Sequence, residues 1–183
     1  MAIGRTFKEA LWKGVRSLET GKAFGSETYD RNLIPQKLIT PTPERLSYIR
    51  FALESGYTVE QIHERTSIDP WFLEQIREVV EFESTLKKVT LDTASRELVE
   101  TAKRYGVSDA QLAKTWGTNE VAVRTRRKEL GVRAVFNRVD TCAAEFESFT
   151  PYLYSTYENA CEADPSERKK VMILGSGPNR IGQ

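Results

Sequence analysis

The sequence is poor in the residues and patterns that mark several common classes of protein. It has two cysteines and one histidine in 183 residues, too few for a disulfide scaffold or for a metal site built from several histidines. No apolar run approaches the roughly 20 residues of a membrane-spanning helix, and the first residues lack the apolar core of a secretion signal. The net charge of +1 gives no overall attraction to nucleic acid or to a membrane. These absences predict a cytoplasmic protein with no metal ligands and no membrane partner.

The end of the sequence looks like the beginning of a different domain. Four consecutive apolar residues, Val171 to Leu174, predict a short buried strand, and a loop with Gly175, Gly177 and Gly182 follows at once. This order opens many α/β nucleotide-binding units, because glycine lets the backbone turn tightly and approach a ligand. Such a unit also needs a helix and a second strand, whereas the sequence stops at Gln183. We therefore expect one strand of a truncated α/β domain, in a chain cut from a longer protein, and not a complete nucleotide-binding enzyme domain.

Most of the remaining chain is predicted to form short amphipathic helices. The first follows a capping box at Thr6 and Glu9, with Phe7, Leu11, Val15 and Leu18 as its predicted inward face. Glycines and prolines between residues 21 and 43 predict an irregular connection and a domain boundary near Thr20. Further helix starts are predicted at Thr42–Pro43, Thr58, Asp69–Pro70, Thr93, Ser108 and after Thr118, with stops at Gly56, Gly106 and Gly131. The predicted fold is mainly α, a bundle of short helix-turn-helix hairpins, with an extended segment after Val132 and the terminal strand.

Two of these hairpins resemble each other at a constant offset of 50 residues. Gly56 aligns with Gly106 and Thr58 with Ser108, within the segments 56–76 and 106–126. Few aligned residues are identical, so the pattern indicates a possible repeat of two hairpins packed in one bundle.

The two hairpins carry opposite charge. Residues 103–133 contain eight Lys and Arg against three Asp and Glu, whereas residues 54–83 contain two against eight. A short capped helix, a glycine turn and the basic helix with Arg124, Arg126 and Arg127 follow one another as in a DNA-binding helix-turn-helix. A nucleic-acid-binding module is therefore an alternative function. The opposite electrostatic fields of the acidic and basic hairpins are equally compatible with protein–protein contact. A basic helix face exposed to solvent is the simpler interpretation of this pattern. Contact with a second copy, with Arg124, Arg126 and Arg127 as the association surface, is a further hypothesis, and we expect no nucleic-acid partner.

The segment after residue 132 is rich in aromatic residues. Tyr152, Tyr154 and Tyr157, with Phe146 and Phe149 nearby, predict burial against another surface. Cys142 lies between acidic residues but has no histidine near it in sequence, and a small buried thiol is favoured over a nucleophile.

Four stretches taken together resemble one family. They are Met1–Phe7, Val139–Phe146, Tyr154–Glu158 and Leu174–Gln183, and their order and spacing are similar to those of the large subunit of carbamoyl phosphate synthetase. The resemblance covers the whole chain. It implies that residues 20–162 form the helical oligomerisation domain, that residues 1–19 end the first synthetase half, and that residues 163–183 link to and start the second half.

The resemblance also implies what the complete enzyme does. The family makes carbamoyl phosphate from bicarbonate, glutamine-derived ammonia and two ATP with Mg²⁺ or Mn²⁺, for pyrimidine and arginine biosynthesis, with a small glutaminase subunit as partner. The ATP and metal ligands of the family lie outside this stretch, so no catalytic, cofactor-binding or metal-binding residue is expected here. A glycine loop near the tunnel between the halves is implied at Gly175, Gly177, Asn179, Arg180, Gly182 and Gln183.

Overall fold

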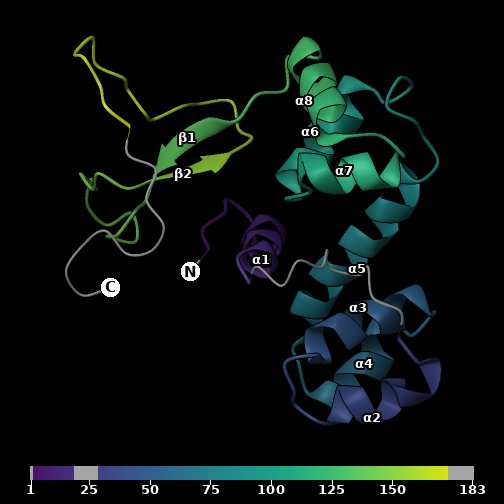
Figure 1. The fold of residues 1–183 in the computed structure, drawn as a ribbon. Helices are drawn as coiled ribbons and strands as arrows, with labels where there is room; N and C mark the ends of the chain where they lie inside the picture. Colours follow the sequence, from purple (N-terminus) through teal and green to yellow (C-terminus); the bar gives the residue numbers. More distant parts are fainter. Residues whose placement is uncertain (1, 19–28, 173–183) are drawn as a thin grey trace.

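The computed structural model describes residues 2–18 and 29–172, and these residues are mainly α-helical (Figure 1). The elements in order are α1 (Phe7–Arg16), the 3-10 helix η1 (Arg31–Leu33), α2 (Ile34–Ile39), α3 (Arg45–Glu54), α4 (Val59–Thr66), α5 (Pro70–Leu86), α6 (Arg96–Arg104), α7 (Asp109–Thr115), α8 (Glu120–Glu129), β1 (Val135–Arg138) and β2 (Leu153–Thr156). The predicted fold class is confirmed. The predicted terminal strand and glycine loop fall largely on residues 173–183, outside the described residues.

Most helix starts lie where local hydrogen bonding places them. Thr58 and Gln61 form a complete capping box at α4, and Ser108 and Gln111 form another at α7. Two predicted starts are wrong. The α6 helix is capped by Ser95, because Thr93 instead accepts a hydrogen bond from the Thr90 amide. The α3 helix begins at Arg45 without any side-chain cap, so the Thr42–Pro43 prediction does not hold.

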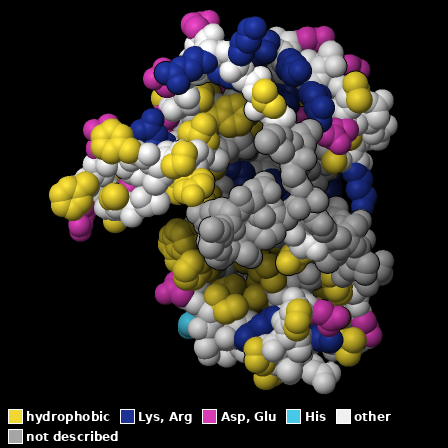
Figure 2. Space-filling model, turned by 60° about the vertical axis from the view of Figure 1, so that its left-hand side comes forward, with side chains coloured by type: hydrophobic (Ala, Val, Ile, Leu, Met, Phe, Trp, Pro, Cys, Tyr) yellow, Lys and Arg dark blue, Asp and Glu magenta, His cyan; other side chains and the backbone are white. Residues whose placement is uncertain are grey.

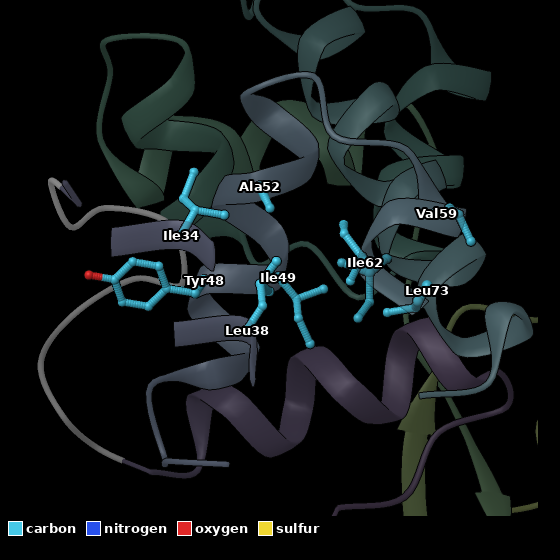
Figure 3. Packing of buried hydrophobic residues seen from close by; sticks show 9 residues of the cluster. Ile34, Leu38, Tyr48, Ile49, Ala52, Val59, Ile62 and Leu73 are labelled. Carbon is cyan, nitrogen blue, oxygen red and sulfur yellow. The ribbon is translucent and has the colours of Figure 1, made fainter. Parts of the chain in front are cut away.

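The predicted irregular connection contains a helix that the sequence analysis missed. Pro35 belongs to the pattern that predicts this connection, but it lies in the first turn of α2, where proline costs no hydrogen bond. Ile34 and Leu38 from this helix are 1% and 0% exposed and join the first core. That core also takes Ile49, Ile62 and Leu73 from α3, α4 and the start of α5 (Figure 3).

A second core follows the same plan 50 residues later. The carbonyl of Ala52 accepts from the Tyr57 amide and that of Ala102 accepts from the Val107 amide, each at 3.0 Å. Ile62 in α4 and Leu112 in α7 are both 0% exposed. The repeat therefore extends to backbone hydrogen bonds and core positions. Figure 1 shows the long α5 connecting the group α2–α4 to the group α6–α8.

The α1 helix packs with the second core through a residue outside its predicted inward face. Trp12 is 2% exposed and lies with Val79, Leu112 and Val123, whereas Leu18 is 68% exposed. The prediction for Leu18 is wrong because the helix ends at Arg16. In this way α1 is anchored to helices that follow it by about a hundred residues.

The two strands form an antiparallel pair beside α1 (Figure 1). Val135 pairs with Thr156 and Arg138 pairs with Leu153. Because successive side chains of a strand point to opposite faces of the sheet, Thr156 and Tyr154 lie on one face and Leu153 on the other. Thr156 is buried and bonds to Glu9 of α1, so the first face packs on α1 and the second faces away from it.

The repeat supplies a matched pair of glycines for a first prediction. Gly56 and Gly106 have φ of +93° and +91°, but a Cβ at Gly106 would lie 3.0 Å from Trp12 Cβ, whereas at Gly56 nothing lies within 4 Å. We expect Gly56→Ala to cost about 1–2 kcal/mol from the left-handed backbone alone. Gly106→Ala should cost about 1–3 kcal/mol more because the core is overpacked. Urea unfolding of both variants measures the difference, and equal losses would contradict the contact with Trp12.

Candidate functional site

A buried ionic cluster lies where the second helical group, α1 and the strand pair meet. At its centre is Asp109, the first residue of α7, which is 8% exposed. Its carboxylate accepts from Lys103 Nζ at 2.8 Å and from Arg127 Nη2 at 2.9 Å. The two cations also donate to backbone carbonyls, Lys103 to Val107 and Arg127 to Val132, at 2.8 and 2.9 Å. The buried charges are thus paired with one another and make further hydrogen bonds to the backbone, as buried charges require.

The pKa values of this cluster reflect burial and pairing. Burial tends to raise the pKa of Asp109, but the hydrogen bonds from Arg127 and Lys103 outweigh it and leave that pKa below the ordinary value. Burial lowers the pKa of Lys103, and the bond to Asp109 opposes this. For Arg127, burial is outweighed by the hydrogen bond to Asp109, and its pKa is raised. Asp109 is therefore a stable anion that holds two cations in place.

Tyr157 attaches the strand pair to this cluster. Lys103 Nζ lies 5.2 Å and Arg127 Cζ lies 5.6 Å from the centre of its ring, within the range of cation–π attraction. Arg104 Nε donates to the Tyr157 carbonyl at 3.1 Å. Burial raises the pKa of the Tyr157 phenol, which stays neutral at physiological pH. The ring and the backbone of one residue thus fix the chain after β2 onto α6 and α8.

Glu9 ties α1 to the same strand. Its carboxylate is 2% exposed and accepts from the Arg5 amide at 2.7 Å and from Thr156 Oγ1 at 3.1 Å. Lys13 Nζ lies 2.8 Å from its other oxygen. We call Glu9, Lys103, Asp109, Arg127, Thr156 and Tyr157 together the ionic junction. It holds three segments that are distant in sequence in one arrangement.

A cavity adjoins the ionic junction. Its volume is about 190 Å³, and it is lined by Glu9, Arg16, Lys103 and Asp109 among others. Among residues 2–18 and 29–172 there is no group of three or more His, Cys, Asp or Glu able to hold a metal ion. Within the same ranges no helix has the length and apolar content needed to cross a bilayer.

The three arginines expected to form an association surface occupy different positions. Arg124 is exposed on α8 and pairs with Glu120 at 2.7 Å, and Arg126 lies 3.5 Å from Glu129. Arg127 is only 9% exposed and belongs to the ionic junction. Counting charges along the sequence cannot show which of these arginines is buried, because the partner of Arg127 lies 18 residues earlier on another helix. The accessible part of this surface is therefore Arg124 and Arg126, with Lys128 beside them.

Acidic residues of the first hairpin are largely paired locally. Arg77 bridges Glu74 and Glu81 on α5 at 2.5 and 2.6 Å, and Glu78 pairs with Lys8 of α1. Glu60 and Glu64 on α4 are exposed. The negative charge that this hairpin can offer to a partner is therefore smaller than the number of acidic residues in 54–83 suggests.

Other predicted positions fall in two groups. Gly175, Gly177, Asn179, Arg180, Gly182 and Gln183 lie outside the described residues. Cys142 is partly exposed, so the prediction of a buried thiol is wrong, and its amide donates to Asp140 in a tight turn. The sequence analysis missed Glu9, Lys103, Asp109 and Thr156 as junction residues, and only the predicted capping box at Thr6 and Glu9 hinted at one of them. That box is half formed, because Thr6 accepts from the Glu9 amide but the Glu9 carboxylate accepts from the Arg5 amide.

Comparison with known proteins gives a consistent result. Residues 1–131 match the family model described as carbamoyl-phosphate synthetase large chain, oligomerisation domain. Proteins named carbamoyl phosphate synthase large chain are similar over 100% of this chain: 52% identical in Acidobacterium capsulatum, 50% in Archaeoglobus fulgidus and 48% in Pseudomonas aeruginosa. The chain spans only 17–18% of the length of these relatives.

Proposed function

Because this chain belongs to the carbamoyl-phosphate synthetase large-chain family, through the oligomerisation domain, we propose that it is the self-associating segment that connects the two synthetase halves of such a large chain. The observation that carries the proposal is the match of residues 1–131 to that domain, together with relatives about half identical over all of the chain. Its mainly helical fold fits a connecting role.

The activity that we propose belongs to the whole large chain. It would make carbamoyl phosphate from bicarbonate, glutamine-derived ammonia and two ATP with Mg²⁺ or Mn²⁺, for pyrimidine and arginine biosynthesis in the cytoplasm, with a glutaminase subunit as partner. This chain would contribute no catalytic group. We assign residues 1–19 to the end of the first half, 20–162 to the oligomerisation domain and 163–183 to the start of the second half. Trp12 and Glu9 would then transmit the position of the first half to the helical body.

The proposal is tested by light scattering coupled to gel filtration, over a wide range of protein concentration and at two salt concentrations. We expect a concentration-dependent dimer or larger species. A monomer at every concentration would contradict self-association of this chain, while leaving its family membership unchanged.

The association surface gives a second prediction. We propose that Arg124 and Arg126 face acidic residues of a second copy, such as Glu60 and Glu64 of α4, in a two-fold arrangement. Reversing both arginines to glutamate should weaken association about tenfold or more at low salt, since like charges would then face each other. The effect should shrink at high salt, where surface charges are screened.

A matched control reverses two exposed cations elsewhere. Arg168→Glu with Lys169→Glu makes the same change in net charge on a segment distant in sequence from α8. Equal weakening by both double variants would mean that net charge alone governs association, and no weakening by either would remove the proposed surface.

A further inference from the structure

Trp71 and Phe72, in the first turn of α5, form an exposed aromatic surface at one end of that helix. They are 53% and 42% exposed, and among residues 2–18 and 29–134 no other aromatic side chain is as exposed. We call these two residues the aromatic pair. Exposed clusters of large apolar side chains mark contact surfaces, and aromatic residues are enriched at the centres of protein interfaces.

The aromatic pair is held in a fixed position by local and tertiary contacts. The Asp69 carboxylate accepts from the Trp71 amide at 2.8 Å, and Pro70 occupies the first turn of α5. The Phe7 ring of α1 lies 5.6 Å from the Trp71 ring and 5.2 Å from the Phe72 ring, centre to centre, both in an edge-to-face arrangement. Because the rings are ordered before a partner arrives, association costs little side-chain entropy.

Acidic side chains border the aromatic pair. Only residues 67–69 connect α4 to α5, so α4 and the aromatic pair belong to the same end of the molecule. Glu60 and Glu64 of α4 and Asp69 before α5 are exposed. This acidic border favours a partner that offers cations beside an apolar side chain.

The opposite end of α5 carries such a surface. Val121 of α8 is 70% exposed, and Arg124 and Lys128, which follow it at intervals of three and four residues, are exposed on the same helix face. Figure 2 shows Lys and Arg side chains gathered over the end of the molecule that α6–α8 form. An apolar side chain flanked by cations is complementary to an aromatic pair flanked by carboxylates.

The two surfaces cannot meet within one copy. Figure 1 places α4 and α8 at opposite ends of α5, and the 17 residues of α5 span about 25 Å. A two-fold axis perpendicular to α5 places the start of this helix in one copy beside α8 of the other, and the same contact then forms twice. Both surfaces lie within residues 1–131, which match the model described as an oligomerisation domain.

We infer that the aromatic pair is the apolar centre of the self-association interface and packs against Val121 and Arg124 of a second copy. This inference rests on the proposed self-association and names the contact that supplies most of its affinity. The Arg124 guanidinium would lie over the Trp71 ring in a cation–π contact. Pairs between arginines and glutamates at the rim would orient the two copies and contribute less to the affinity.

Substitutions on both surfaces test this inference by light scattering coupled to gel filtration. Trp71→Ala should weaken association about thirtyfold or more, the loss expected for an aromatic residue at the centre of an interface. Val121→Glu should weaken it at least as much, because a carboxylate would face the acidic border of the other copy. Both losses should persist at high salt, since the burial of apolar surface is not screened as surface charges are.

The control uses two phenylalanines on the connection between β1 and β2. Phe146 and Phe149 are 75% and 77% exposed, so their predicted burial against another surface is not met within the described residues. Phe146→Ala with Phe149→Ala removes more exposed aromatic surface than Trp71→Ala and should leave association unchanged. A loss confined to this control would assign the interface to the connection and overturn the inference.

A double-mutant cycle shows whether Trp71 and Arg124 of different copies touch. Trp71→Ala combined with Arg124→Ala should weaken association by less than the product of the two single effects, because residues in contact are not additive. The two residues lie at opposite ends of α5 in one copy, so the coupling reports a contact between copies. Additive losses would overturn the pairing of the two surfaces.

The remaining outcomes separate this inference from the proposed function. Urea unfolding shows that each variant is folded, and Val121→Glu keeps the test valid if Trp71→Ala is unstable, because Val121 makes few contacts at 70% exposure. Unsubstituted chain that associates as tightly as folded Trp71→Ala or Val121→Glu would overturn the inference alone. Unsubstituted chain that stays monomeric at every concentration would contradict the proposed self-association itself, and the inference with it.

Discussion

Replacing Asp109 by alanine is expected to lower the free energy of unfolding by about 3–5 kcal/mol, because it leaves two buried cations without a counter-charge. Lys103 and Arg127 are 6% and 9% exposed and both donate to this carboxylate. The loss should be measured by urea unfolding at neutral pH. It should be accompanied by faster hydrogen exchange around Tyr157, whose ring packs against the same two cations.

The matched control is an ion pair on the surface. Glu100 pairs with Arg104 at 2.9 Å on the outside of α6, and Glu100→Ala should cost no more than about 0.5 kcal/mol. Similar losses for the two variants would contradict the central place of Asp109 in the junction.

The pH dependence of stability has a definite sign at Asp109. Its pKa is lowered in the folded protein, so its contribution is complete above the pKa of an unfolded aspartate, about 3.9. It is lost as the pH falls through the lower folded value. In Asp109→Ala the acid limb of the stability curve should therefore flatten. An unchanged limb would mean that other carboxylates account for it.

Replacing Trp12 by alanine is expected to cost about 3–5 kcal/mol, since a large buried side chain is removed and a cavity remains. Trp12 is 2% exposed and packs against residues of α5, α7 and α8. Because α1 also carries Glu9, weaker packing of this helix should loosen the contact with Thr156. Urea unfolding measures the loss, and hydrogen exchange of residues 153–157 reports the loosened strand.

Leu18 provides the control for this second variant. It is 68% exposed, close to α1 but outside the core, and Leu18→Ala should change the free energy of unfolding by no more than about 0.5 kcal/mol. If Trp12→Ala cost no more than Leu18→Ala, α1 would not be anchored in the second core.

The sequence by itself determined the local features of this protein. The capping boxes at Thr58 and Ser108 connect residues only three positions apart, and such short contacts can be recognised in a sequence. The repeat at an offset of 50 and the resemblance to the synthetase family are also properties of residue order. The fold class, several helix starts and the family were therefore predictable from residue order alone.

Tertiary structure decided which charged and aromatic residues are buried. Arg124 and Arg127 are the same type of residue on the same helix, and their charges count equally in the sequence. Only Arg127 donates a hydrogen bond to Asp109, which lies on the other helix of the hairpin. Glu9 and Thr156 bond across 147 residues of sequence, and Trp12 is buried by helices that follow much later in the chain. The α2 helix owes its position to the core that takes Ile34 and Leu38. A local pattern specifies hydrogen bonds over a few residues, whereas the burial of a side chain depends on which distant segment packs over it.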